Sequence, residues 1–200
     1  MIELAWTQDN IVTPRYGDPR TQAIIARCLD GDDRAYGMLY NMYAEIIYRL
    51  TFSILQHQED AEEVLQDSFE YAFRKLHKFN PNKASFKTWI YQIALSRCRN
   101  KRRRKWLPSF SLNWLTDQEL TDENAPAPDQ LVALSERQQT IWQALAELSP
   151  KLRETAVLRH YEGLTYPEIG KILGIPAKTA ESRVRSAHKV LRQLLDASEI

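Results

Sequence analysis

Apolar residues recur at steps of three and four along most of this 200-residue chain, and this spacing limits the possible folds more than any other feature. The clearest runs are Leu39, Tyr43, Ile46, Leu50 and Ile54 in the N-terminal half, and Ala180, Val184, Ala187, Leu191 and Leu194 near the C-terminus. Such steps place side chains on one face of an α-helix, whereas a half-buried strand needs strict alternation. No alternating segment stands out, so the sequence predicts an all-α fold class.

The helical spacing stops in residues 108–128, "PSFSLNWLTDQELTDENAPAP", which contain three prolines, four acidic residues and no basic residue. This composition is typical of a flexible linker. Residues 1–20 also lack periodicity, and we expect them to form a loose leader. The predicted organisation is therefore two small helical domains, at 21–107 and 129–200, joined by a flexible acidic linker.

The charge is strongly segregated, although the net charge is only +1. Residues 59–70 contain six acidic residues and no basic one, and residues 71–105 contain twelve lysines or arginines and no acidic one. An acidic surface is thus expected beside a basic one, which points to charged partners.

Several function classes are excluded by what the sequence lacks. No run of about 18 apolar residues is present, and the N-terminus has no apolar core of a signal peptide, so we expect no membrane insertion and a cytoplasmic location. Cys28 and Cys98 lie far apart without the spacing of metal ligands, which indicates a reducing compartment. We expect no metal, no cofactor and no catalytic residue, since no nucleophile or metal cluster is apparent.

The segment "TYPEIGKILGIPAKTAESRVRSAHKV" has the spacing of a helix-turn-helix. Thr165 and Glu168 predict a capping box, Gly174 suits a left-handed turn, and Gly170 allows two helices to approach closely. The second helix, beginning near Ala177, would then enter a major groove. Its expected DNA-facing residues are Lys178, Thr179, Glu181, Ser182, Arg183, Arg185, Ser186 and Lys189. The alternative is a helical hairpin whose basic face is merely solvated.

Residues 84–105, "ASFKTWIYQIALSRCRNKRRRK", begin with aromatic side chains and end in a basic cluster. Basic residues bind phosphates, and aromatic rings near a loop can stack unpaired bases, so a partly single-stranded target is expected. A membrane-surface helix would instead keep an apolar face along its whole length. Whether Trp89 belongs to the core or faces DNA stays open at this point.

The acidic segment "EDAEEVLQDSFEYAF" predicts a helix for which Asp60 is the expected cap. Asp60, Glu63 and Asp67 share one face of this helix, with Gln66 adjacent. Two interpretations remain open for the face, a solvated surface and a docking site for a basic protein.

"DAEEVLQDSFEYAF" with "FKTWIYQIALSRCRNKRRR" resembles region 2 of a bacterial sigma factor, and "ALAELSPKLRETAVLRHYEGLTYPEIGKILGIPAKTAESRVRSAHKVLRQLL" resembles region 4. Because regions 1 and 3 of the larger sigma factors are missing, the chain resembles the extracytoplasmic-function (ECF) group. This resemblance implies a promoter-specificity subunit of RNA polymerase for a stress or envelope-type regulon, without catalytic activity of its own. The alternative is a stand-alone helix-turn-helix regulator that does not bind polymerase.

The resemblance also implies residue roles. Docking on the coiled coil of the polymerase β′ subunit falls on Asp60, Glu63, Gln66, Asp67 and Phe69. Contact with melted DNA of the -10 element falls on Phe79, Asn80, Lys83, Ser85, Lys87, Trp89, Arg97, Arg99, Lys101 and Arg102. The helix that begins near Ala177 would read the -35 element as duplex.

Further partners follow from the resemblance alone. They are core RNA polymerase at its β′ coiled coil and β flap, promoter DNA, and an anti-sigma factor that covers regions 2 and 4. The acidic linker would occupy the polymerase cleft or the RNA exit path. Ala180, Ser96 and Glu181 depart from residues that are common in the family, so the preferred promoter sequence cannot be carried over.

Overall fold

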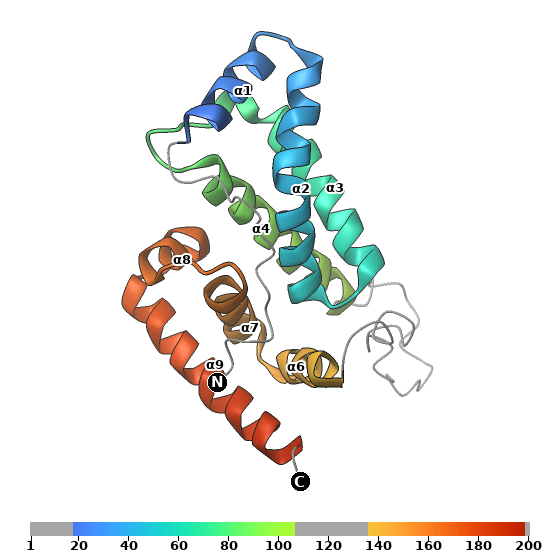
Figure 1. Ribbon diagram of the computed structural model, residues 1–200, viewed down its shortest axis with the longest axis vertical. Coiled ribbons are helices and arrows are strands. Elements are labelled where there is room, and N and C mark those ends of the chain that lie inside the picture. Colours follow the sequence, from blue (N-terminus) through green and yellow to red (C-terminus); the bar gives the residue numbers. More distant parts are fainter. Residues whose placement is uncertain (1–17, 107–135, 199–200) are drawn as a thin grey trace, which may run out of the picture.

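The computed structural model describes residues 18–106 and 136–198, and within these ranges the chain is helical with no strand, which confirms the predicted all-α class (Figure 1). The N-terminal domain contains α1 (Pro19–Leu29), α2 (Asp33–Leu55), α3 (Gln58–Arg74), the short 3-10 helix η2 (Leu76–Lys78) and α4 (Phe86–Trp106). The C-terminal domain contains α6 (Glu136–Glu147), α7 (Pro150–Ala156), the π-helical turn η3 (Val157–Tyr161), α8 (Tyr166–Leu173) and α9 (Ala177–Ser198). The predicted linker, 108–128, lies outside the described residues.

In the N-terminal domain, α2 packs against α1, α3 and α4, and α3 also packs against α4 (Figure 1). Leu39, Ile47 and Leu50 of α2 are completely buried, as the three- and four-residue steps predict. From α4, Ile90 and Ala94 enter the same core with no exposed surface. The apolar stripe of α2 therefore organises this domain.

Two helix starts differ from the predicted ones. α1 begins at Pro19, and Asp18 caps it by accepting hydrogen bonds from the backbone nitrogens of Arg20 and Thr21, both at 3.2 Å. This places the helix start inside the predicted leader, because Asp followed by Pro is a strong start signal. α3 begins at Gln58 with His57 as its cap, so the expectation that Asp60 caps this helix was wrong.

The C-terminal domain has its own small core between α6, α7 and α9, formed by Ala144, Leu145, Leu148, Ala156, Ala187 and Leu191. A second set of its side chains, including Leu158, Ile169 and Ile172, belongs to the same apolar cluster as the core of the N-terminal domain. Consequently α8 packs along α4, and η3 packs against α2 (Figure 1). The two domains form a continuous apolar interface, which the sequence did not predict.

No helix in the described part of the chain combines the length and the hydropathy that crossing a membrane requires. Both cysteines are buried and free, and burial raises the pKa of the Cys28 and Cys98 thiols.

Candidate nucleic-acid interface

The helix-turn-helix is built as predicted. A capping box starts α8: the Thr165 backbone nitrogen donates to Glu168 Oε2 at 2.8 Å, and the Thr165 side chain accepts from the Glu168 backbone nitrogen. Gly174 ends α8 with φ of 68°, in the left-handed region that a side chain disfavours. Gly170 faces the turn so closely that an added Cβ would lie 2.7 Å from the carbonyl oxygen of Ile175. These features fix the angle at which α9 leaves the turn.

The polar face of α9 is open to solvent. Its buried face is formed by Ala180, Val184, Ala187 and Leu191. None of the eight predicted DNA-facing residues is buried: Lys178, Ser182, Arg185, Ser186 and Lys189 are exposed, and Thr179, Glu181 and Arg183 are partly exposed. The Arg185 Nη2 atom lies 2.5 Å from Glu181 Oε1, so Arg185 offsets the negative charge of Glu181 on the face predicted to contact DNA. A basic, exposed helix positioned in this way can enter a major groove.

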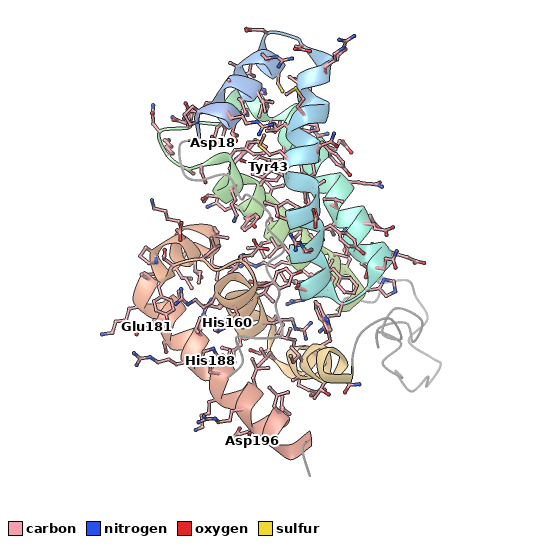
Figure 2. All side chains as sticks on the ribbon, in the orientation of Figure 1. Asp18, Tyr43, His160, Glu181, His188 and Asp196 are labelled. Carbon is pink, nitrogen blue, oxygen red and sulfur yellow. The ribbon has the colours of Figure 1, made fainter. Side chains whose placement is uncertain are left out.

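On the other side of α9, His188 faces His160 of η3 (Figure 2). The centroids of the two rings are 4.4 Å apart. Burial, together with the nearby His188 and Arg159, lowers the pKa of His160 to about 4. The imidazole of His160 is therefore neutral at neutral pH.

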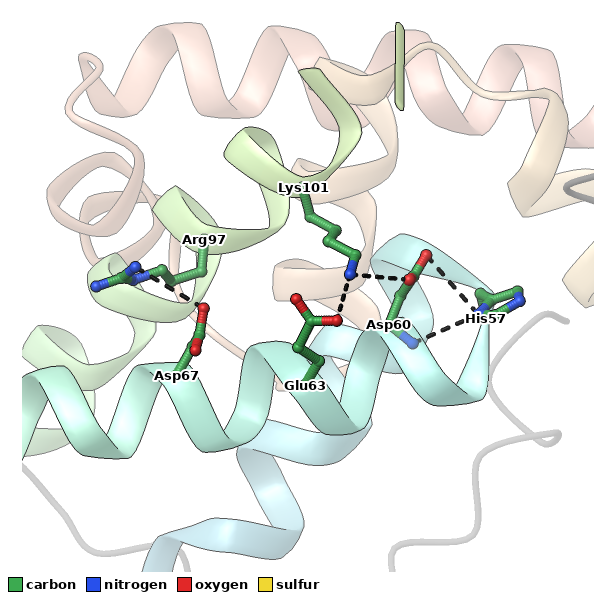
Figure 3. A network of polar contacts seen from close by, with 6 residues as sticks. All are labelled: His57, Asp60, Glu63, Asp67, Arg97 and Lys101. Carbon is green, nitrogen blue, oxygen red and sulfur yellow. Dashed lines mark hydrogen bonds and ion pairs between the residues drawn. The ribbon is translucent and has the colours of Figure 1, made fainter. Parts of the chain in front are cut away.

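In the N-terminal domain the acidic face of α3 and the basic face of α4 are paired with each other (Figure 3). The Lys101 Nζ atom lies 3.3 Å from Asp60 Oδ1 and 2.5 Å from Glu63 Oε2, and Arg97 Nη1 lies 3.9 Å from Asp67 Oδ2. Burial opposes the charged form of Lys101, but the hydrogen bonds that this lysine donates to Glu63 and Asp60 outweigh that effect and raise its pKa. The carboxylates of α3 that are predicted to dock on polymerase thus pair with the cations of α4 that are predicted to contact DNA.

The five residues expected to dock on polymerase differ in their access. Glu63 and Gln66 are exposed and Asp67 is half-exposed. Asp60 is buried between Lys101 and His57, and Phe69 lies in the core with its ring 4.7 Å from that of Tyr40. The part of this helix face that a partner can reach is therefore formed by Glu63, Gln66 and Asp67. Asp60 and Phe69 are buried beneath that surface and are not available for direct contact.

Three aromatic rings cluster where the loop after η2 meets α4. The ring of Phe79 lies 5.7 Å from Phe86 and 5.3 Å from Trp89. Phe86 is buried, whereas Phe79 and Trp89 are partly exposed. Trp89 therefore both packs on the core and reaches the surface. An exposed aromatic edge beside a loop can stack an unpaired base.

Turn-forming contacts hold the loop itself. Asn80 Oδ1 accepts a hydrogen bond from the backbone nitrogen of Asn82 at 2.9 Å, which is an Asx turn. Ser85 Oγ accepts one from the Thr88 nitrogen at 3.1 Å and so caps α4. Asn80 and Lys83 are exposed at the loop tip. The polar loop residues expected to contact -10 DNA thus lie next to the aromatic cluster.

A small hollow beside this loop is lined partly by residues of the predicted leader and of α2. Asp18 Oδ2 lies 2.8 Å from Thr21 Oγ1, which in turn lies 3.0 Å from the hydroxyl of Tyr43 (Figure 2). Burial raises the pKa of Tyr43 to about 12, so it remains a hydroxyl donor. The Asp-Pro pair at 18–19 was the sequence signal that could have placed α1 here.

Two further predicted DNA-binding cations of α4, Lys87 and Arg99, meet the C-terminal domain. The Nε and Nη2 atoms of Arg99 bind both carboxylate oxygens of Glu154, at 2.7 to 3.2 Å. Lys87 Nζ lies 3.8 Å from Glu162 Oε2, and the Tyr91 hydroxyl donates to the same oxygen. Burial lowers the pKa of Lys87 and raises the pKa of Glu162, and each ion partly offsets this effect on the other. Nothing in the local sequence marks Glu154 or Glu162 as partners of α4.

Two family models match this chain: Sigma-70 region 2 at residues 39–107, and Sigma-70, region 4 at residues 131–191. The RNA polymerase sigma factor NccH of Alcaligenes xylosoxydans xylosoxydans is 30% identical over 181 residues, which cover 90% of this chain and 96% of NccH. The ECF RNA polymerase sigma factor SigW of Bacillus subtilis is 30% identical over 172 residues, which cover 82% of this chain and 91% of SigW.

Among solved structures, CnrH in complex with the cytosolic domain of CnrY superposes with a TM-score of 0.68 at 24% identity. The match covers 88% of this chain and 97% of CnrH. At that level of identity the likeness establishes a shared fold.

Proposed function

The chain belongs to the family of ECF RNA polymerase sigma factors, and we propose that its two domains contact two different forms of promoter DNA. The N-terminal domain, proposed to span 21–107, would hold the melted -10 strand. The C-terminal domain, proposed to span 129–200, would read the -35 element as duplex. Family membership makes the chain a promoter-specificity subunit and replaces the alternative of a stand-alone regulator.

The observation that carries this division is the different surroundings of the two basic surfaces. On α4, cationic side chains continue from an aromatic cluster beside a polar loop, which suits a single strand with unstacked bases. On α9, cationic side chains stand on an exposed helix after a tight turn, which suits a major groove. Aromatic side chains cannot stack on the bases of an intact duplex, because those bases are already stacked on one another.

We assign polymerase docking to Glu63, Gln66 and Asp67, the accessible part of the acidic face of α3. A basic or polar surface on the polymerase β′ coiled coil would compete there with Lys101 and Arg97. Contact of region 4 with the β flap and placement of residues 108–128 in the polymerase cleft or RNA exit path rest on the family resemblance. The protein would act in the cytoplasm and carry out no chemistry itself.

An anti-sigma factor is a further proposed partner. CnrH, whose fold this chain shares, has been solved in complex with the cytosolic domain of CnrY, and the RpoE sigma factor of Bartonella quintana, at a TM-score of 0.64 and 22% identity, with the anti-sigma factor NepR. Copurification of such a protein with this chain from its native cells would support the proposal, and its absence would count against it.

Reconstituted transcription tests the proposed function. Purified chain is mixed with core RNA polymerase, and binding and promoter-directed transcripts are measured. The reversal Asp67→Arg is expected to abolish core binding and transcription while the affinity for -35 duplex stays unchanged. Glu45→Arg reverses an exposed carboxylate on another helix, α2, where it pairs with Arg49, and it should leave both activities intact. Failure of the unaltered chain to bind core polymerase would refute the proposal.

A further inference from the structure

Two of the four histidines of this chain meet in the C-terminal domain, although they are 28 positions apart in the sequence. His160 lies in the π-helical turn η3, and His188 lies on α9 (Figure 2). Their Nε2 atoms face each other directly, and the planes of the two rings are inclined by 37°. Neither the proposed DNA contacts nor the proposed polymerase docking uses this histidine pair.

The backbone of η3 places His160 opposite α9. In this turn the Glu162 nitrogen donates to the Val157 carbonyl oxygen at 3.2 Å, which is the five-residue hydrogen bond of a π-helix. Such backbone is rare and occurs mostly as single turns, frequently at functional sites. The irregular turn and the histidine pair therefore coincide at one place in the fold.

The histidine pair borders a small apolar hollow between α6, η3 and α9. Leu145, Val157 and Leu191 contribute to the lining of this hollow. Both imidazole rings also remain accessible to solvent. An apolar surrounding controls the access of water to the ligand atoms, while the open side lets an ion and its remaining water ligands enter.

Two neutral imidazoles with facing Nε2 atoms have two possible uses for those atoms. One ring can donate its Nε2–H to the other, or both rings can carry their proton on Nδ1 and offer the Nε2 lone pairs to a metal ion. Imidazole nitrogen is a favoured ligand of divalent transition metals such as Zn²⁺, whereas Mg²⁺ and Ca²⁺ prefer oxygen. The histidine pair therefore has the chemistry of a transition-metal site.

The surroundings limit the strength of such a site. Within residues 18–106 and 136–198, no third histidine, cysteine or carboxylate completes a larger cluster of metal ligands. Arg159 is a neighbouring cation, and its guanidinium is engaged by the Leu164 carbonyl oxygen at 2.9 Å and by the Tyr166 ring. Two imidazoles and water would complete the coordination, so binding should be weaker than at a structural zinc site with four protein ligands.

We propose that His160 and His188 together bind one divalent transition metal ion through their Nε2 atoms. With Zn–N bonds of about 2.0–2.1 Å in a tetrahedral site, the two nitrogens lie about 3.3 Å apart. They are closer in the structure, so a small rotation of the exposed side chains must separate them. The ion holds α9 against η3 and stabilises the C-terminal domain, because it binds the folded chain in preference to the unfolded one. This inference does not depend on the proposed function.

Titration of the chelator-treated full chain with Zn²⁺ tests the inference by calorimetry and thermal unfolding. We expect one ion per chain and an unfolding temperature that rises by several degrees. His188→Gln should weaken binding by more than about tenfold, since loss of an outer-shell partner alone costs about 10–100-fold, and it should remove the thermal shift. His77→Gln replaces an exposed histidine of η2 and should bind like the unaltered chain. Mg²⁺ should cause no shift.

The ligand atoms are identified by nitrogen NMR of the imidazole rings in the unaltered chain, so this readout does not depend on the folding of a variant. Zn²⁺ is expected to shift the Nε2 resonances of His160 and His188 and to leave a proton on each Nδ1. Shifts at His57 or His77 instead would place the ion elsewhere and overturn the inference. Equal zinc affinity of His188→Gln and the unaltered chain, or no binding to either, would also overturn it.

Discussion

The basic surfaces of α4 and α9 contain similar side chains, but most predicted DNA-binding cations of α4 contact a carboxylate, whereas on α9 only Arg185 does so among the described residues. On α4, Lys87, Arg99 and Lys101 each contact a carboxylate. On α9, Lys178 and Lys189 are exposed, and within the described residues no ion pair engages them. Both surfaces contain enough lysine and arginine to bind phosphate. They differ in how many of these cations already contact a carboxylate of the protein.

This comparison shows how one chain can present two DNA sites at different stages. The α9 surface needs no rearrangement, since duplex DNA can approach it directly. In the role proposed for α4, phosphates would first have to displace the carboxylates that its cations contact. Such an exchange would couple binding of the melted strand to the separation of the domains, whereas binding of the duplex would be independent of it.

The largest expected effect comes from filling the turn that positions α9. Gly170→Ala would place a Cβ 2.7 Å from the Ile175 carbonyl oxygen and 3.3 Å from the Ala177 nitrogen. We expect destabilisation of the C-terminal domain by roughly 1–3 kcal/mol and loss of -35 duplex binding. Gly37→Ala, on α2 with open space around the site, should instead stabilise the protein by about 0.5–1 kcal/mol. Thermal unfolding and duplex titration measure both.

The next effect separates the two surfaces by the kind of DNA they bind. Trp89→Ala removes a partly exposed ring from the cluster with Phe79 and Phe86. The affinity of the polymerase-bound chain for single-stranded -10 DNA should fall by roughly 1–3 kcal/mol, and its affinity for -35 duplex should not change. Trp89→Phe should retain most of the binding. An equal loss on both DNA forms would contradict the division of roles.

A smaller effect is expected on the duplex side. Lys178→Ala and Lys189→Ala each remove one exposed cation from α9. If both contact phosphates, each substitution should reduce the salt-dependence slope of duplex binding by about one and weaken binding to all sequences alike. The exposed Lys151 of α7 provides the control, since its substitution by alanine should leave the slope unchanged. Titration at several salt concentrations gives the slopes.

The smallest effect concerns the stability of the C-terminal domain at acidic pH. The pKa of His160 is lowered to about 4 from an ordinary value of 6.5, so the unfolded chain binds the proton more readily than the folded one. Stability should therefore fall as the pH decreases from about 6.5 towards 4. His160→Gln should flatten this part of the profile of unfolding temperature against pH. If the His160→Gln variant shows the same profile as the unaltered chain, protonation of His160 does not cause the loss of stability.

Much of this molecule follows from local sequence rules. The helices of both domains follow the apolar steps, and the capping box at Thr165 and the left-handed Gly174 were predicted from residue type and spacing alone. These features depend on contacts within a few residues. The family resemblance supplied the roles of the surfaces, which no local rule contains.

The contacts between the domains could not be predicted in this way. Glu154 and Glu162 look like ordinary surface acids in the sequence, and Arg99 looks like a free cation, because nothing local indicates that they meet across 55 residues or more. Likewise Phe69, expected at the docking face, proves to be a core residue, since an apolar helix position does not reveal which neighbour will cover it.

The distance between the domains tests the central claim most directly. Spin labels on the exposed positions Asn41→Cys of α2 and Gln193→Cys of α9 report it in the full chain. In the free protein we predict a single narrow distance distribution, which shifts to longer distances when core polymerase and promoter DNA are added. A broad distribution in the free protein, or a narrow one that persists unchanged in the promoter complex, would contradict the exchange of carboxylates for DNA on α4.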